Sequence, residues 1–153
     1  DGRHAVGVIG SETVSGDPMA QLVSGFIAPS LIKDGVPEVS TSTLIAPRTA
    51  LGIDANGALL LLTVDGIEGG SRGMNMTELA AAFAELGAQQ AVNLDGGGST
   101  VAWYDGEVID HPTCTDSLVK CERAVASIIC VKSPEKLAAG TSGLMGPRSR
   151  LRK

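Results

Sequence analysis

Three consecutive glycines, Gly96 to Gly98, follow directly on an apolar segment that contains the polar residues Asn93 and Asp95. Residues 91–95 have the composition of a buried β-strand, and period two predicts that Asn93 and Asp95 share one face of it. Three residues without a Cβ let a ligand approach the backbone closely. We call residues 93–99 the glycine corner. Three glycines after an aspartate can also serve only as a tight turn between two strands.

The glycine corner carries groups suited to binding an anion. Glycine amides can donate to an oxyanion, the hydroxyl of Ser99 or Thr100 can add a hydrogen bond, and Asp95 at a strand end can orient a reacting group. Better-known glycine motifs do not fit, because the phosphate-loop lysine and a dinucleotide pattern are both lacking. Ser99 is not in a G-x-S-x-G nucleophile elbow, since Val101 occupies the last position. These mismatches disfavour a nucleotide site or a serine esterase.

A β-hairpin is predicted upstream of the corner. The segments Thr43–Ile53 and Ala58–Val64 are apolar and rich in strand-forming residues, and residues 54–57 between them supply the Asn and Gly of a tight turn. Pro47 lacks an amide hydrogen, which predicts that the first strand bends or lies at an edge.

One helix is predicted over residues 76–86, where apolar residues recur at helical spacing. Asn75 is placed as the N-cap, with Glu78 in capping-box register, and Gly87 can adopt the left-handed conformation that ends a helix.

Shorter strand signals occur elsewhere, and a polar excursion over Ser30–Ser42 holds a turn at residues 33–35. The expected strands are Ala5–Ile9, Leu22–Ile27, Ser99–Tyr104 leading to a turn at Asp105–Gly106, and a last core strand Ala124–Val131. Strands with one helix predict an α/β domain of the α+β kind, in which the helix packs on mixed β-sheet layers.

Length and charge limit the function classes. The chain of 153 residues, 43% of them apolar, can bury one core, so residues 1–132 are expected to form one domain and residues 133–153 a basic, disordered tail. Residues 1–131 carry 16 acidic and 6 basic side chains, which argues against nucleic-acid binding. No apolar run is long enough to span a membrane. We see no signal peptide, and a chain that opens on Asp1 is expected to lack the start of its precursor. Whether the chain forms a homo-oligomer stays open.

The cysteines favour an oxidising compartment. Cys114 and Cys121 lie seven positions apart in a polar stretch, which makes a disulfide plausible. A zinc site is the alternative, but His111 is the one further ligand nearby, and no cofactor or metal is expected. Cys130 stands in an apolar run and is expected to be a small core residue.

Arginine is scarce outside the tail. It occurs at Arg3, Arg48, Arg72 and Arg123. Arg48 lies inside the apolar hairpin strand, where a guanidinium either pairs with a structural carboxylate or grips a phosphate with two hydrogen bonds. From residue chemistry alone, these two roles stay equally open.

Several of these segments together resemble the phosphodiester glycosidase family in order and spacing, over residues 5–132. They are Pro47–Asp54, Val64–Gly66, Arg72–Asn75, Asn93–Ser99 and Arg123. The stretch Gln21–Gly25 and the spacing of the three cysteines are similar to the family's animal members in particular. The resemblance implies that an amino-terminal part of the family's domain lies upstream of Asp1, that Cys114 pairs with Cys121, and that the partner of Cys130 lies upstream.

The resemblance also implies a function. Animal members remove N-acetylglucosamine from mannose 6-phosphodiesters on N-glycans of lysosomal hydrolases, which exposes mannose 6-phosphate in the late Golgi. A phosphate leaving group is already stable, so phosphate binding should dominate over acid catalysis. We expect Asp95 to act as base or oxocarbenium stabiliser and Asp65 to be a candidate second carboxylate.

The remaining predicted site residues bind the substrate. They are Arg48, Arg72, Asn93, Gly96, Gly97, Gly98, Ser99 and Arg123. The expected partner is a phosphorylated N-glycan or a related sugar phosphodiester, and the expected place is the secretory pathway, in the Golgi or outside the cell. Three alternatives stay open: a relative acting on another phosphodiester-linked polysaccharide, a non-catalytic carbohydrate-phosphate binding module, and a purely structural fragment.

Overall fold

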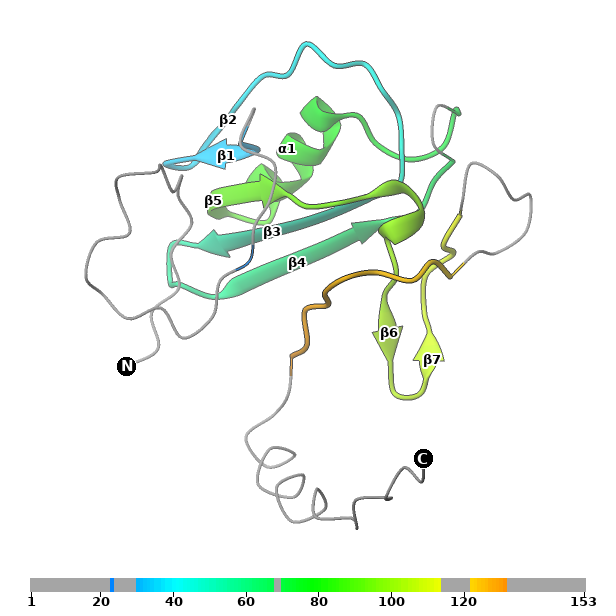
Figure 1. Cartoon of the computed structure of the whole chain (residues 1–153). Helices are drawn as coiled ribbons and strands as arrows, with labels where there is room; N and C mark the ends of the chain where they lie inside the picture. The colour runs from blue at the N-terminus through cyan, green and yellow to red at the C-terminus, as the bar shows by residue number, and fades with distance from the viewer. Residues whose placement is uncertain (1–22, 24–29, 68–69, 114–121, 132–153) are drawn as a thin grey trace, which may run out of the picture.

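The computed structural model describes residue 23 and residues 30–67, 70–113 and 122–131. These form a five-stranded sheet in the order β2-β1-β5-β3-β4, a helix packed on the sheet, and a separate two-stranded hairpin of β6 and β7 (Figure 1). Every pairing between these strands is antiparallel. Because one helix packs on the sheet, the expected layered domain with one helix is confirmed. The elements are β1 (Ile32–Lys33), β2 (Val36–Pro37), β3 (Arg48–Asp54), β4 (Leu59–Val64), α1 (Met76–Glu85), β5 (Ala88–Asn93), the 3₁₀ turn η1 (Gly97–Ser99), β6 (Trp103–Tyr104) and β7 (Glu107–Val108).

The predicted hairpin is present as β3 and β4. Asp54 holds its turn, since Oδ1 accepts hydrogen bonds from the amides of Asn56 and Ala58, both at 2.8 Å, and Gly57 has the expected positive φ. The first strand is shorter than predicted because it begins at Arg48, just after Pro47. β3 lies between β4 and β5 rather than at an edge, so the proline marks the start of a central strand.

The predicted helix and both of its ends are confirmed. Asn75 accepts from the amide of Glu78, and the Glu78 carboxylate accepts from the amide of Asn75, which is the expected capping box. Gly87 follows the helix with φ +79°. One side of α1 faces the sheet through four buried residues, Met76, Leu79, Ala80 and Phe83.

The core lies between α1 and the sheet. Phe83 is fully buried and packs against Gly52 of β3, where a Cβ would lie 2.8 Å from the aromatic ring. Ala50 of β3 and Ala91 of β5 are also fully buried in this layer. Small residues on the central strands therefore let the helix approach closely. Leu59 and Leu61, which alternate on the other face of β4, are each 48% exposed.

Three expectations about strands need correction. The polar excursion over Ser30–Ser42 contains the small β1–β2 hairpin, with its turn where predicted. The strand expected over Ser99–Tyr104 is reduced to β6, because the chain first makes the η1 turn. The last core strand expected over Ala124–Val131 is wrong: this segment has no strand pairing and is exposed throughout, since no described strand lies beside it to complete its ladder.

Cys130 is also exposed, because it lies in this segment, so it is not the core residue that was expected, and it forms no disulfide within the described part of the chain. Ala5–Ile9, most of Leu22–Ile27, the pair Cys114 and Cys121, and the tail all lie outside the described residues. Over the ranges that the structure describes, it contains no helix with the length and apolar composition needed to cross a bilayer.

Candidate active site

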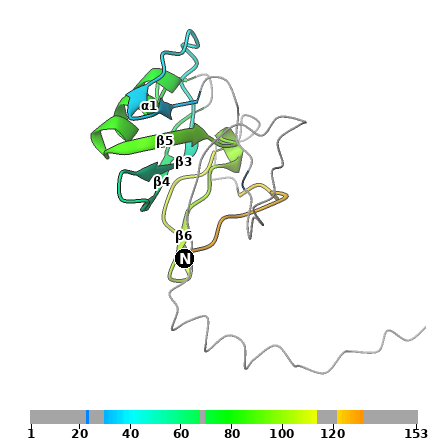
Figure 2. The same cartoon turned by 90° about the vertical axis from the view of Figure 1, so that its left-hand side faces the viewer.

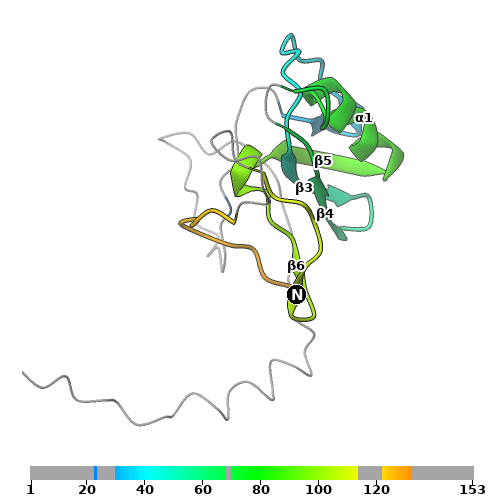
Figure 3. The same ribbon diagram turned by 90° about the vertical axis from the view of Figure 1, so that its right-hand side faces the viewer.

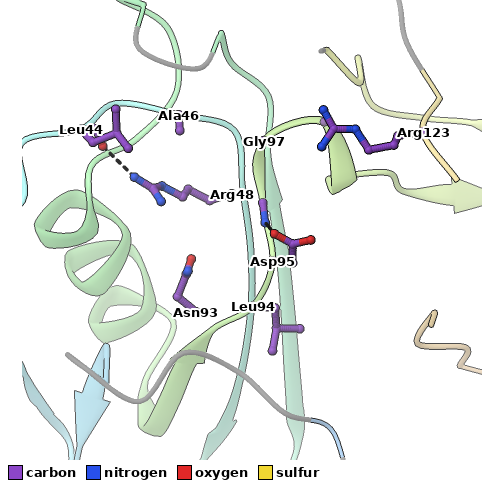
Figure 4. A pocket seen from close by; sticks show the side chains of 10 residues that line it. Leu44, Ala46, Arg48, Asn93, Leu94, Asp95, Gly97 and Arg123 are labelled. Carbon is purple, nitrogen blue, oxygen red and sulfur yellow. Dashed lines mark hydrogen bonds between the residues drawn. The ribbon is translucent and has the colours of Figure 1, made fainter. Parts of the chain in front are cut away.

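A pocket of about 210 Å³ lies at the glycine corner, beyond the end of β5 (Figure 4). Its lining comes from three segments that are far apart in the sequence. They are the approach to β3 with Leu44, Ala46 and Arg48, the glycine corner with Asn93, Leu94, Asp95, Gly96, Gly97 and Gly98, and Arg123. The antiparallel pairing of β3 with β5 brings the first two segments together.

The glycine corner is fixed against the start of β3 by backbone hydrogen bonds. The amide of Gly97 donates to the carbonyl of Pro47 at 3.0 Å, and the amide of Leu94 donates to Thr49 at 2.8 Å. A Cβ on Gly96 would lie 2.8 Å from the Pro47 oxygen. This glycine is therefore needed so that the corner can pack against the protein's own backbone.

Arg48 is held by two backbone carbonyls from different segments of the chain. Its Nε donates to Met74 O at 3.0 Å and its Nη2 donates to Leu44 O at 2.6 Å. Ala46 and Met74 also form a β-bridge, so the guanidinium reinforces the contact between the approach to β3 and the loop before α1. These two bonds place a half-buried positive charge at the pocket wall.

Arg123 supplies a second positive charge from a different part of the chain. Figure 4 shows its guanidinium extending toward the turn at Gly97, while Arg48 lies on the other side of that turn. Two guanidinium groups on one small pocket favour an anionic ligand. The sequence pointed to both arginines, and the fold brings both to the same pocket.

Asp95 lies in the same pocket, but not as expected relative to Asn93. β5 ends at Asn93 and the chain bends at Asp95, so period two does not extend to the aspartate. Asn93 is 6% exposed and Asp95 is exposed; Figure 4 shows their side chains on different sides of the chain. The prediction that they share a face is wrong. Asp95 Oδ1 accepts from the amide of Gly96 at 3.0 Å, which orients the carboxylate.

Asn93 carries an unsatisfied polar atom. Its Oδ1 is buried and has no hydrogen-bond partner among the described residues, and the side chain points toward Arg48 (Figure 4). Buried polar atoms without partners are rare and costly in folded proteins. This atom therefore marks the pocket as a place where a ligand donor would be accommodated.

The three glycine amides are not equally available. Gly96 donates to the Asp95 carboxylate and Gly97 donates to Pro47, while Ser99 donates to the carbonyl of Gly96. Gly98 is the one of the three glycines whose amide has no acceptor within the described part of the chain. An oxyanion site at this corner would depend on Gly98 and the two arginines rather than on all three amides.

Three predicted site residues do not line this pocket. Ser99 forms the end of the η1 turn, and Arg72 is exposed in the loop before α1. Asp65 follows β4, where its Oδ1 accepts from the amide of His111 at 2.8 Å. The neighbouring carbonyl of Gly66 accepts from the Thr113 hydroxyl, so Asp65 helps to anchor the segment that follows β7.

Thr49 and Asp110 were not predicted as site residues, whereas the hydroxyl of Thr100 was expected as a possible donor to an anion. The hydroxyls of Thr49 and Thr100 bond each other at 3.2 Å beneath the turn, and Thr100 is 1% exposed. Both carboxylate oxygens of Asp110 are buried without a partner among the described residues. The sequence gives no signal for Asp110, since nothing around it predicts burial. In the described residues, no group of three or more His, Cys, Asp or Glu side chains is placed to hold a metal ion.

A carboxyl group away from the pocket has a shifted pKa. Asp54, at the far end of β3 from Arg48, has its pKa lowered, chiefly by the hydrogen bond from the amide of Ala58. Asp54 belongs to the β3–β4 turn, so this shift reports on the fold.

Comparison with known proteins decides the family. The family model described as phosphodiester glycosidase matches residues 1–132. The chain belongs to the phosphodiester glycosidase family. Two curated members, both named N-acetylglucosamine-1-phosphodiester alpha-N-acetylglucosaminidase, are 32% identical to it in Bos taurus and 31% identical in Homo sapiens. The alignments cover 94% and 88% of this chain but 31% and 30% of those proteins.

A solved structure supports the same family. The catalytic domain of zebrafish N-acetylglucosamine-1-phosphodiester alpha-N-acetylglucosaminidase, described as auto-inhibited by its pro-peptide, superposes with a TM-score of 0.55 at 29% identity. The match covers 63% of this phosphodiester glycosidase chain and 38% of the zebrafish chain. A Bacillus subtilis prophage-derived protein, YomE, is 32% identical over 111 residues. The chain thus spans about a third of the length of its curated animal relatives.

Proposed function

We propose that the protein hydrolyses the glycosidic bond between N-acetylglucosamine and the phosphate of a mannose 6-phosphodiester, and so uncovers mannose 6-phosphate on N-glycans. The observation that carries the proposal is the pocket in which Arg48, Arg123 and Asp95 meet at the glycine corner. The relatives' names describe hydrolysis of an N-acetylglucosamine-1-phosphodiester, which matches a site with two cations and one carboxylate.

The cationic side of the pocket suits the phosphodiester. A diester bears one negative charge, and guanidinium groups donate to phosphate oxygens with charge-assisted hydrogen bonds. Because the phosphate leaves as a stable anion, stabilising it by Arg48, Arg123 and the Gly98 amide contributes directly to the transition state. Arg48 is already immobilised by its two carbonyl partners, so little ordering is needed when the substrate binds.

Asp95 is the acidic side chain that the described residues contribute to the pocket. Its carboxylate is oriented by the Gly96 amide, and in this role it stabilises the oxocarbenium-like transition state or activates water. The two-carboxylate scheme needs a second acid. Asp65 stays a prediction for that role, and a residue outside the described part of the chain is the alternative.

The test is hydrolysis of a synthetic N-acetylglucosamine-alpha-phosphomannose diester by the full-length protein that contains this chain. Asp95→Asn should lower kcat by about 10²–10⁴-fold, the range for a lost acid–base group, while the thermal unfolding midpoint stays unchanged. Asp105→Asn is the matched control, because Asp105 is exposed in the β6–β7 turn with a positive φ that Asn tolerates. Wild-type turnover by Asp95→Asn would remove Asp95 from the mechanism.

A second candidate function is a carbohydrate-phosphate binding module without catalysis. It is favoured by the position of Asp65, which bonds to the backbone of His111 and does not line the pocket. The binding module predicts that the full-length protein binds the diester without cleaving it. Product formation at any steady rate would exclude it.

The remaining elements of the proposal rest on the resemblance to the animal members of the family. We propose that the protein acts in the Golgi or outside the cell, on phosphorylated N-glycans or a related phosphodiester-linked polysaccharide. The pairing of Cys114 with Cys121 and a homo-oligomeric state belong to this proposal. Mass spectrometry of the non-reduced protein tests the disulfide, and light scattering tests the oligomer.

A further inference from the structure

The β6–β7 hairpin exposes two of the chain's four aromatic side chains. Trp103 is 68% exposed and Tyr104 is 72% exposed, and they are adjacent in the sequence. The three views in Figures 1, 2 and 3 show the hairpin projecting from the sheet on the side away from α1. Large aromatic side chains on a projecting element are typical of recognition surfaces.

The hairpin is rigidly connected to the glycine corner. β6 follows the η1 turn closely, and Thr100 between them is buried and bonded to Thr49. After the hairpin, the amide of Ile109 donates to the carbonyl of Ala102 at 2.9 Å. The amide of His111 then bonds to Asp65, which ties the returning chain to the end of β4. A surface held at both ends in this way loses little entropy when it binds a ligand.

The two faces of the hairpin differ in chemistry. Register pairs Tyr104 with Glu107 and Trp103 with Val108, and side chains alternate between faces along a strand. The first pair joins an exposed phenol ring to an exposed carboxylate, whereas the second joins two apolar side chains, of which Val108 is half-buried. A sugar residue offers an apolar C–H face to an aromatic ring and hydroxyl donors to a carboxylate. The Tyr104–Glu107 face fits that chemistry, and the Trp103–Val108 face fits contact with protein.

Tyr104 lies a short distance along the chain from the pocket. Gly98 lines the pocket and stands six positions before Tyr104, so the chain between them spans at most about 20 Å. A substrate whose phosphodiester occupies the pocket would extend a few sugar residues beyond the phosphate. These residues are neutral, so ring contacts and hydroxyl hydrogen bonds, rather than ion pairs, are the interactions available to hold them.

We infer that the Tyr104–Glu107 face is a subsite for the neutral sugars of the glycan that carries the phosphodiester. The inference rests on the proposed function, because it assigns to the hairpin the part of the substrate that the pocket does not hold. Tyr104 stacks on the C–H face of one sugar residue, and the Glu107 carboxylate accepts hydrogen bonds from its hydroxyls. The subsite selects phosphodiesters attached to an oligosaccharide over small ones.

The test compares two substrates with the full-length protein. One is the N-acetylglucosamine-alpha-phosphomannose diester alone, and the other is the same diester on a mannose oligosaccharide. Tyr104→Ala should raise KM for the oligosaccharide about three- to tenfold, the range expected for one lost aromatic contact, and leave KM for the small diester unchanged. Glu107→Gln should shift KM in the same direction by a smaller factor. Trp103→Ala is the matched control, because it removes a ring of similar exposure from the opposite face.

A direct binding measurement separates failure of the subsite from failure of the proposed function. NMR titration of the protein with a mannose oligosaccharide that has no phosphate should give a dissociation constant that Tyr104→Ala weakens and Trp103→Ala preserves. If the small diester is cleaved but Tyr104→Ala leaves both KM values unchanged, the subsite is refuted and the proposed function stands. If neither diester is cleaved, the proposed function fails, and the titration alone decides the subsite. Equal losses of oligosaccharide affinity in Tyr104→Ala and Trp103→Ala would refute a face-specific subsite and indicate that the hairpin is needed for packing against protein.

Discussion

Replacing Gly96 by Ala tests the idea that the glycine corner must pack against the start of β3. The φ of Gly96, −132°, lies outside the left-handed region that favours glycine, so the predicted effect of a side chain here rests on its steric contact. The new Cβ would lie 2.8 Å from the Pro47 oxygen, about 0.6 Å closer than the 3.4 Å at which ordinary contact begins. Overpacking of this kind costs about 1–3 kcal/mol.

A side chain at Gly96 would also weaken a hydrogen bond of the corner. Moving the corner away from Pro47 weakens the bond from the Gly97 amide, now 3.0 Å long, which is worth about 0.5–1.5 kcal/mol. Together the two effects predict a loss of about 1.5–4.5 kcal/mol in the free energy of unfolding. Because Asp95 and Gly98 belong to the same turn, kcat should fall as well, by up to about a hundredfold if they move by 1 Å.

Chemical denaturation and diester hydrolysis, measured on the same preparations, check both predictions. Gly57→Ala is the control, since Gly57 has φ +80° and no atom within 4 Å of an added Cβ. That variant should lose about 1–2 kcal/mol through backbone strain and keep wild-type activity. A Gly96→Ala protein with wild-type stability and wild-type kcat would show that the corner relaxes freely, which would refute the packing argument.

Two further predictions concern the ends of elements. Asn75→Ala should lower the free energy of unfolding by about 0.5–2 kcal/mol, because the capping box is lost. Glu78→Gln keeps an acceptor for the Asn75 amide and should cost less. If chemical denaturation shows equal losses of unfolding free energy in the two variants, the capping account is contradicted. Asp54 has a lowered pKa in the folded protein, so its stabilising contribution is present above the carboxyl's ordinary pKa and is lost as pH falls through the lowered pKa. The free energies of unfolding of the wild type and Asp54→Asn, measured by denaturation across that acidic range, should therefore converge at low pH. A difference that stays constant with pH would show that the titration of Asp54 does not contribute to stability.

The local elements could be predicted from the sequence because their signals lie within a few residues. The helix has its cap at Asn75 and its end at Gly87, and the β3–β4 turn has an aspartate that bonds its own backbone. Such interactions need no distant partner, so composition and spacing suffice. The same holds for the turn of the β6–β7 hairpin at Asp105 and Gly106, where both residues have positive φ.

Features that depend on distant partners could be predicted only in part. The segment over Ala124–Val131 has a strand composition, but a strand also needs a neighbour to complete its hydrogen bonds, and the sequence does not show whether one is present. The exposure of Cys130 follows from the same missing neighbour. At the glycine corner, the sequence pointed to several residues that line one pocket, and their binding of an anion stays a prediction. The different directions of Asn93 and Asp95 depend on where β5 ends.

The pocket is also a late product of folding. Two of its three lining segments are the approach to β3 and the glycine corner, which are separated by some fifty positions and meet only when β5 pairs with β3. Closing a loop of that size costs chain entropy before any stabilising contact forms between its ends. Because α1 and the β3–β4 turn need only local contacts, they can form earlier than the pocket. Arg48 reaches its two carbonyl partners only after the loop before α1 has docked. During synthesis the pocket therefore cannot be complete until Arg123 has left the ribosome, after all strands of the central sheet have been made.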